Sequence, residues 1–223
     1  MTYSDIRRIA RENIQENYWQ SVLVAFVAAL LGGLMVGSSM FSISLDAEQI
    51  SQLPRILVRY FALIGSISGL LGFASFIVGG TIQLGYAQYL LKQHNHAHLD
   101  IHDLFNQFDR FKDGFLQSFL RGLYTALWAL LFIIPGIIKS YSYAMTPFIM
   151  AENPDMSAKE AIAASQQMMD GHKGELFMLG LTFIGWDLLA ALTLNIGYIF
   201  LNPYKNAAYA VFYKNLTAPS AEF

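Results

Sequence analysis

The sequence contains no cysteine, so disulfide bonds, thiolate metal sites and catalytic cysteines are excluded. It is also poor in charge, because charged residues make up only 13% of its 223 residues, about half the usual share of a soluble domain. The 14 Lys and Arg residues do not outnumber the 16 Asp and Glu residues, so the composition does not favour a nucleic-acid partner.

Known catalytic signatures are missing as well. The sequence contains no phosphate-binding Walker loop, no GxSxG nucleophile motif and no HExxH zinc motif. We therefore expect a protein that is not an enzyme and that has no cofactor and no catalytic, cofactor-binding or metal-binding residues.

Apolar residues are correspondingly abundant and make up 55% of the chain. They gather in four long runs, and a helix needs about 20 apolar residues to cross a bilayer. The sequence therefore predicts an all-α fold, a polytopic transmembrane helical bundle with membrane lipids around it. The runs cover residues 21–37, 56–91, 115–150 and 176–216.

The number of spans depends on breaks within the runs. Pro135-Gly136 divides the third run, because proline lacks an N–H group and clashes with the preceding turn. Asn195-Ile196-Gly197 could turn the fourth run, whereas the second run has no polar break and is expected to form one long helix. Six spans, including two short or kinked helix pairs, are the first interpretation, and four long spans are the alternative.

The distribution of positive charge favours six spans. Six spans place eleven Lys and Arg residues in the cytoplasm and three outside, whereas four spans give nine and five. Residues 137–150 are short for a crossing, so a tilted or partly re-entrant pair stays open. Both topologies place the N-terminus and the C-terminus in the cytoplasm.

We expect a single transmembrane domain over residues 1–216, followed by a frayed tail over 217–223. Residues 1–18 are expected to form an amphipathic cytoplasmic helix with Ser4 as its N-cap, retained rather than cleaved as a signal peptide. This helix either lies on the membrane surface or extends the first span.

The segments 92–114 and 151–175 are expected to connect spans in the cytoplasm. In the second of these, Ser157 and Glu160 have the spacing of a capping box, and Gly171 supplies a stop. Both segments are expected to carry interfacial amphipathic helices, with packing against the protein's own spans as the alternative.

Several motifs resemble those of an uncharacterised bacterial family of integral membrane proteins, described only as a domain of unknown function. The N-terminal motif is residues 6–13 followed by Tyr18-Trp19, and the longer one runs through residues 132–143. Further matching residues are Pro147, Asn153-Pro154-Asp155, Ser165, Met168-Met169, Gly171-His172-Lys173, Leu176-Phe177, Phe183-Ile184-Gly185-Trp186 and Pro203-Tyr204. The resemblance implies a multi-pass protein of the bacterial plasma membrane. The middle of the chain also looks distantly like the membrane domain of glycerophosphodiester phosphodiesterases.

Charged residues inside the apolar runs are the main candidates for function, because charge is costly within a bilayer. Lys139 and Asp187 are expected to pair across the bundle, with Tyr141 and Tyr143 beside the lysine. This intramembrane polar site is interpreted either as a substrate or proton site or as a structural pair. Arg59, near a span end, is expected to snorkel to the membrane surface.

Two other features of the sequence bear on binding and on helix packing. His94, His96, His98 and His102 form a stretch that is expected to be a solvated loop, with metal binding or pH sensing as the alternative. Small residues around Gly65, Gly69 and Gly79-Gly80 are expected to allow close helix packing.

Two functions follow from these observations. The first is a binding, lipid-handling or transport-related role within the bilayer, which is based on the broken third run and its polar residues. The second is a scaffold or accessory subunit whose cytoplasmic amphipathic helices recruit a membrane-protein partner or a second copy of the chain.

Overall fold

The computed structural model describes residues 2–32, 55–193 and 196–218, with only the backbone described over 55–71. Every regular element in these ranges is helical, which confirms the predicted all-α class for this part of the chain. The helices are α1 (Tyr3–Gln15), α2 (Tyr18–Leu31), α4 (Arg55–His94), α5 (Phe111–Leu131), α6 (Ile133–Ser142), α7 (Thr146–Glu152), α8 (Ala158–Met168), α9 (Lys173–Leu181), α10 (Ile184–Leu192) and α11 (Gly197–Thr217), with short 3₁₀ turns η1 (Ile101–Leu104) and η2 (Phe108–Arg110).

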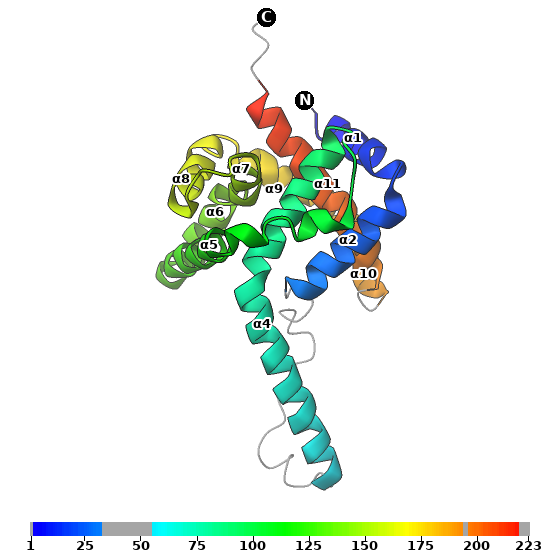
Figure 1. Ribbon diagram of the computed structural model, residues 1–223. Helices are drawn as coiled ribbons and strands as arrows, with labels where there is room; N and C mark the ends of the chain where they lie inside the picture. Colours follow the sequence, from blue (N-terminus) through cyan, green and yellow to red (C-terminus); the bar gives the residue numbers. More distant parts are fainter. Residues whose placement is uncertain (1, 33–54, 194–195, 219–223) are drawn as a thin grey trace, which may run out of the picture.

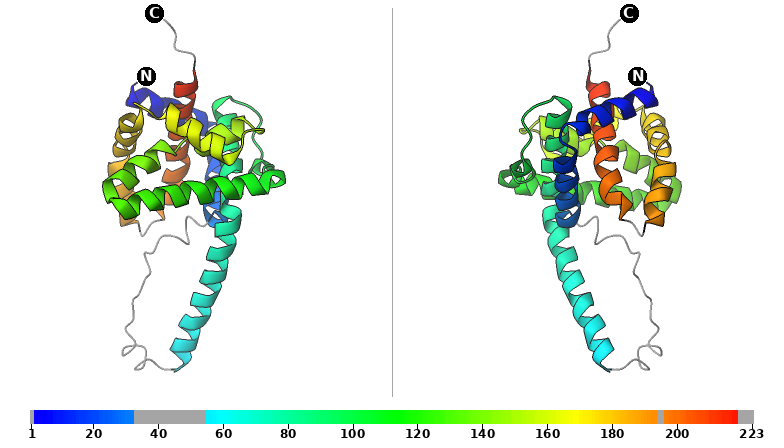
Figure 2. Two further views of the ribbon diagram at one scale, coloured as in Figure 1. Left: turned by 90° about the vertical axis from the view of Figure 1, so that its left-hand side faces the viewer. Right: turned by 90° about the vertical axis from the view of Figure 1, so that its right-hand side faces the viewer.

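The helices gather around one half of α4, whose other half extends beyond them (Figure 1). The start of α1, the end of α4 and the end of α11 lie at the same end of the molecule. Helices α2, α10 and α11 run roughly along α4, whereas α5 lies across it (Figure 2). The first described helix therefore begins, and the last one ends, at the same end of the molecule.

The long second run forms a single helix of 40 residues, α4, as the sequence predicts. Its glycines bring neighbouring helices close. A Cβ atom at Gly80 would lie 2.1 Å from the carbonyl oxygen of Gly114 in α5, and one at Gly79 would lie 3.0 Å from the carbonyl oxygen of Gly32. The predicted close packing is therefore confirmed at Gly79-Gly80, while Gly65 falls where only the backbone is described.

The third run breaks three residues before the predicted position. Phe132 is extended, with φ −155° and ψ 138°, and it separates α5 from α6. Pro135 lies in the first turn of α6, where a missing N–H group costs no helical hydrogen bond. Gly136 lets the two helices cross, because a Cβ atom there would lie 2.6 Å from Ala129. The expected hairpin exists, but proline starts its second helix instead of forming the break.

The fourth run contains a break that the sequence analysis missed. Helices α9 and α10 meet at Thr182-Phe183 with a bend of 44°. The predicted turn between α10 and α11 follows Leu192 and ends at Gly197, while Asn195 itself lies outside the described residues. Pro203 is buried within α11 and does not end that helix.

The N-cap of α1 is Thr2, so the predicted N-cap Ser4 is wrong. The Thr2 hydroxyl accepts a hydrogen bond from the amide of Asp5, and the Asp5 carboxylate accepts one from the amide of Thr2. The helix begins two residues earlier than expected, because the backbone amides of Thr2 and Asp5 both have side-chain hydrogen-bond acceptors there.

The apolar face of α1 packs against the protein's own helices, chiefly α11. Ile6, Ala10 and Ile14 are buried in the main core. This result favours internal packing over the predicted position on the membrane surface. A turn at Glu16-Asn17 also separates α1 from α2, so α1 is not a straight extension of the first apolar helix.

Helix α8 confirms the predicted capping box. The Ser157 hydroxyl accepts from the amide of Glu160, and the Glu160 carboxylate accepts from the amide of Ser157. Gly171 follows with φ +81°, a backbone conformation that glycine adopts readily. The apolar face of α8, with Ala161 and Ile162, is buried, so internal packing again holds over an interfacial position.

We also asked whether the described helices could cross a bilayer. No single one of them is both long and apolar enough, whereas the bent pair α9–α10 meets that criterion by length and composition.

Candidate functional site

Asp187 pairs with Lys205 rather than with the predicted partner Lys139. The two carboxylate oxygens of Asp187 accept hydrogen bonds of 2.9 and 3.0 Å from the Lys205 ammonium group. Both side chains are about three-quarters buried. The physical reason is the packing of α11 beside α10, which brings Lys205 of α11 next to the Asp187 carboxylate.

Lys139 is compensated differently. Its ammonium group lies 5.1 Å from the centre of the Trp128 ring, across the α5–α6 hairpin. A cation over an indole face gains electrostatic stabilisation without a carboxylate. The expected Lys139–Asp187 site therefore does not form as a pair.

The two predicted tyrosines lie on this same hairpin side. The Tyr141 ring meets the edge of Phe177 at 5.9 Å between centroids. Tyr143 is buried, with its ring 6.3 Å from that of Tyr124. Their aromatic neighbours give both residues packing roles, Tyr141 against α9 and Tyr143 against α5.

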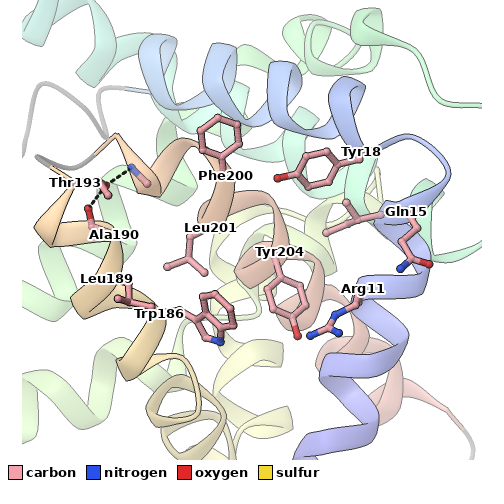
Figure 3. Close-up of a pocket in the computed structure, with 12 residues that line it drawn as sticks. Arg11, Gln15, Tyr18, Trp186, Leu189, Ala190, Thr193, Phe200, Leu201 and Tyr204 are labelled. Carbon is pink, nitrogen blue, oxygen red and sulfur yellow. Dashed lines mark hydrogen bonds between the residues drawn. The ribbon is translucent and has the colours of Figure 1, made fainter.

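A cavity lies elsewhere, between α1, α10 and α11 (Figure 3). This cavity, which we call the aromatic cavity, has a volume of about 490 Å³. The side chains of Trp186, Phe200, Leu201 and Tyr204 surround it, and α1 contributes Arg11 from the opposite side. The remaining lining residues are Ile14, Gln15, Tyr18, Leu189, Ala190, Thr193 and Gly197.

The lining follows one helical face on each of the three helices. Three segments of the sequence each contribute residues at positions i, i+3, i+4 and i+7, a spacing that places side chains on a single face of a helix. They are residues 11, 14 and 15 in α1 with 18 at the start of α2, residues 186, 189 and 190 in α10 with 193 at its C-cap, and residues 197, 200, 201 and 204 in α11. The sequence analysis missed this site, although the matching periodicity was the signal that could have found it.

Two hydrogen bonds of Thr193 lie at one edge of the aromatic cavity. The Thr193 hydroxyl donates to the Ala190 carbonyl at 2.7 Å and accepts from the Gly197 amide at 2.8 Å. These bonds fix the end of α10 against the start of α11, so two of the three lining faces are held in a defined relation (Figure 3).

A second hollow, of about 350 Å³, adjoins the aromatic cavity and shares Arg11, Gln15 and Tyr204 with it. We call it the arginine hollow, because Arg7, Arg8 and Arg11 all line it. Its other residues are Ser4 and Glu12. Three cationic side chains against one carboxylate give this hollow a net positive charge.

The arginines of the hollow are held to different degrees. Arg7 donates to the Thr182 carbonyl at 3.2 Å, and Arg8 pairs with Glu12 at 3.0 Å. The Arg11 guanidinium lies 5.9 Å from the centre of the Tyr204 ring, at the wall that both openings share. Arg11 is therefore the cation best placed to meet a ligand that occupies both.

The four histidines of the predicted stretch differ in their exposure to solvent. His94 is half-buried at the end of α4, and its Nδ1 lies 3.2 Å from the Asn13 amide nitrogen. Burial, chiefly, holds the pKa of His94 below its ordinary value, with a smaller effect of Lys214. His96, His98 and His102 are exposed. Within the described ranges, no group of three metal-ligating side chains is found.

Part of this chain matches a known protein family. Residues 130–220 match the model of a family described as "Protein of unknown function (DUF975)". The match supports the resemblance to an uncharacterised family over the region from the end of α5 through α11. No curated protein and no solved structure matches the chain, and the similarity to glycerophosphodiester phosphodiesterases is not shown.

Proposed function

We propose that this protein is a non-enzymatic, multi-pass protein of the bacterial plasma membrane that binds an anionic lipid. Its lipid site is the arginine hollow together with the aromatic cavity. The observation that carries this proposal is the wall formed by Arg11, Gln15 and Tyr204, which is shared by a cationic opening and an apolar one. We also propose that both termini lie on the cytoplasmic side.

Exposed apolar side chains support a membrane location. At the tip of the α5–α6 hairpin, Leu130 is 85% exposed and Ile133 is 75% exposed, and Leu192 at the end of α10 is 80% exposed. Soluble proteins seldom expose contiguous apolar surface of this extent. A bilayer would cover these side chains.

The direction of α5 bears on the number of spans. Because α5 lies across α4, an α4 that stands along the membrane normal leaves the α5–α6 hairpin lying within the bilayer (Figure 2). This geometry supports the re-entrant form of the third run over two complete crossings.

The two openings match the two ends of a lipid. A phosphate group in the arginine hollow would meet the Arg11 guanidinium, which forms charge-assisted hydrogen bonds with phosphate oxygens. An acyl chain in the aromatic cavity would contact Trp186 and Leu189, which are 51% and 56% exposed. Since these lining side chains are also exposed, a chain can enter from the side.

The alternative role as a scaffold has less support. It depended on apolar faces of the cytoplasmic helices that are free to recruit a partner. The apolar faces of α1 and α8 are instead buried against the protein's own helices, as Ala10 and Ala158 show.

Fluorescence quenching tests the proposal directly. In a Trp19→Phe, Trp128→Phe background, Trp186 is the single indole of the chain. Brominated phosphatidylglycerol should quench Trp186 several-fold more effectively than brominated phosphatidylcholine, because only the first lipid carries a net negative charge to meet Arg11.

Arg11→Gln should abolish this preference, whereas Lys159→Gln on the exposed side of α8 is the matched control and should retain it. Equal quenching by the two lipids in the parent protein would contradict the proposal, as would an unchanged preference in Arg11→Gln.

A further inference from the structure

A separate cavity of about 450 Å³ lies where α4 is crossed by α5, α7 and α11. It shares no lining residue with the aromatic cavity or with the arginine hollow. Most of its wall is apolar, with Phe76 and Leu90 from α4 and Phe148 from α7. Its polar lining residues are Ser75, Gln83, Tyr86, Ser118, Arg121, Asn206 and Tyr209.

Arg121 in α5 is the cation of this cavity. One guanidinium nitrogen, Nη2, donates to the Gln83 side-chain oxygen at 2.7 Å. Across the described ranges, no carboxylate lies within salt-bridge distance of Arg121. A neutral amide therefore satisfies part of the guanidinium fork, and no carboxylate of the described residues compensates the charge of Arg121.

Three other partly buried cations of the bundle pair with carboxylates. Lys205 pairs with Asp187, Lys92 pairs with Asp103 at 2.6 Å, and Lys214 pairs with Glu152. An unpaired charge in an apolar interior is costly, whereas a paired one is largely compensated. Like Lys139, Arg121 has no carboxylate partner among the described residues, but Arg121 lines a cavity in which a bound anion could supply the counter-charge.

A second polar group lies in the same wall. The hydroxyl of Tyr86 is buried without a hydrogen bond of good geometry in the described part of the chain, and the side chain of Asn206 is the polar group beside it. Burying a hydroxyl without a partner is costly, so such groups usually meet a ligand or water. Tyr86 is one turn of α4 beyond Gln83, so the two line the same face.

We propose that this cavity binds an oxyanion carried on a small apolar body, with Arg121 as the binding cation and Tyr86 as a hydrogen-bond donor. The planar guanidinium fork matches the two oxygens of a carboxylate or phosphate group. The rings of Phe76 and Phe148 supply contacts for an aromatic or aliphatic body. Either a soluble organic acid or the headgroup region of an anionic lipid carries this chemistry.

Calorimetric titration of the purified full-length protein in phosphatidylcholine nanodiscs tests the site. The probes are benzoate, octanoate and inorganic phosphate, and a parallel set of nanodiscs contains phosphatidylglycerol. Saturable binding of an organic acid identifies a soluble ligand, whereas protection of the fold by phosphatidylglycerol alone, lost in Arg121→Gln, identifies a lipid.

Arg121→Gln should weaken the binding of the active probe about tenfold or more, because it removes the charge-assisted hydrogen bonds. Lys112→Gln, at an exposed position of the same helix, is the matched control and should bind as the parent does. Arg11→Gln should also leave this binding unchanged, which separates this site from the proposed lipid site.

Two conservative variants keep the test decisive if Arg121→Gln does not fold. Arg121→Lys retains the charge but loses the fork, and Tyr86→Phe retains the ring but loses the hydroxyl. Each should weaken binding several-fold. Unchanged affinity in both, or no response to any probe in the parent protein, would overturn the proposal.

Discussion

The Asp187 carboxylate accepts two hydrogen bonds from the Lys205 ammonium group, at 2.9 and 3.0 Å. The pair joins α10 to α11 and neutralises two charges within an otherwise apolar run. Asp187 therefore does not pair with Lys139, whose ammonium group instead lies over the Trp128 ring. Each charge thus finds its compensation within its own helical hairpin.

This pair predicts a specific pattern of double mutants. Asp187→Asn should lower the free energy of unfolding by roughly 1.5–3 kcal/mol, because it weakens hydrogen bonds to a charged group and leaves Lys205 unpaired. Adding Lys205→Met should recover part of that loss. Thermal unfolding in detergent, followed by circular dichroism, gives the comparison.

Lys139→Met serves as the control for this cycle. Combined with Asp187→Asn, it should give no recovery, since Lys139 contacts Trp128 rather than Asp187. Recovery with Lys139→Met but not with Lys205→Met would show that the predicted Lys139–Asp187 pair is the real one.

The crossing of α4 and α5 predicts opposite effects at two glycines. Gly80→Ala should destabilise the protein by about 2 kcal/mol or more, because the new Cβ atom would lie 2.1 Å from the Gly114 carbonyl oxygen. Gly122→Ala on α5 meets no atom within 4 Å and should stabilise the helix by about 0.5–1 kcal/mol. Thermal midpoints that move in the same direction would contradict this crossing.

His94 predicts a loss of stability in mild acid. Burial lowers the pKa of His94 in the folded protein below its ordinary value of 6.5. The unfolded chain then takes up the proton first, so stability is unaffected well above pH 6.5 and falls as the pH drops below it.

Replacing His94 by Gln should remove this part of the acid sensitivity. Thermal midpoints measured at about pH 7.5 and about pH 5.5 test it, on either side of the ordinary histidine pKa. His98→Gln is the matched control, because that side chain is exposed. An equal acid shift in His94→Gln and in the parent protein would refute the role of His94.

The absence of cysteine allows a direct test of topology. Single cysteines introduced at Glu160 in α8 and at Thr217 at the end of α11 should both react with an impermeant maleimide only after the cells are opened, because both lie on the side of the termini. Phe132→Cys, at the apolar hairpin tip, should stay protected until detergent is added. Labelling of position 160 in intact cells would contradict the proposed orientation.

The sequence by itself determined the local features of this protein. The helical class, the long α4 and the capping box at Ser157 depend on residue spacing and on neighbours within a few positions. Close approach at Gly79-Gly80 was also predictable, because only the absence of a side chain permits it. Even Pro135 correctly indicated a hairpin, although it begins α6 where the sequence suggested a break.

The tertiary structure decided which distant residues meet. The choice of Lys205 over Lys139 as the partner of Asp187 depends on how α11 folds back on α10, which no local pattern specifies. The aromatic cavity likewise requires three helical faces from opposite ends of the chain, and the environment of Arg121 depends on which helices cross α4. Pairing and burial are properties of long-range contacts, so they emerge only when the helices pack.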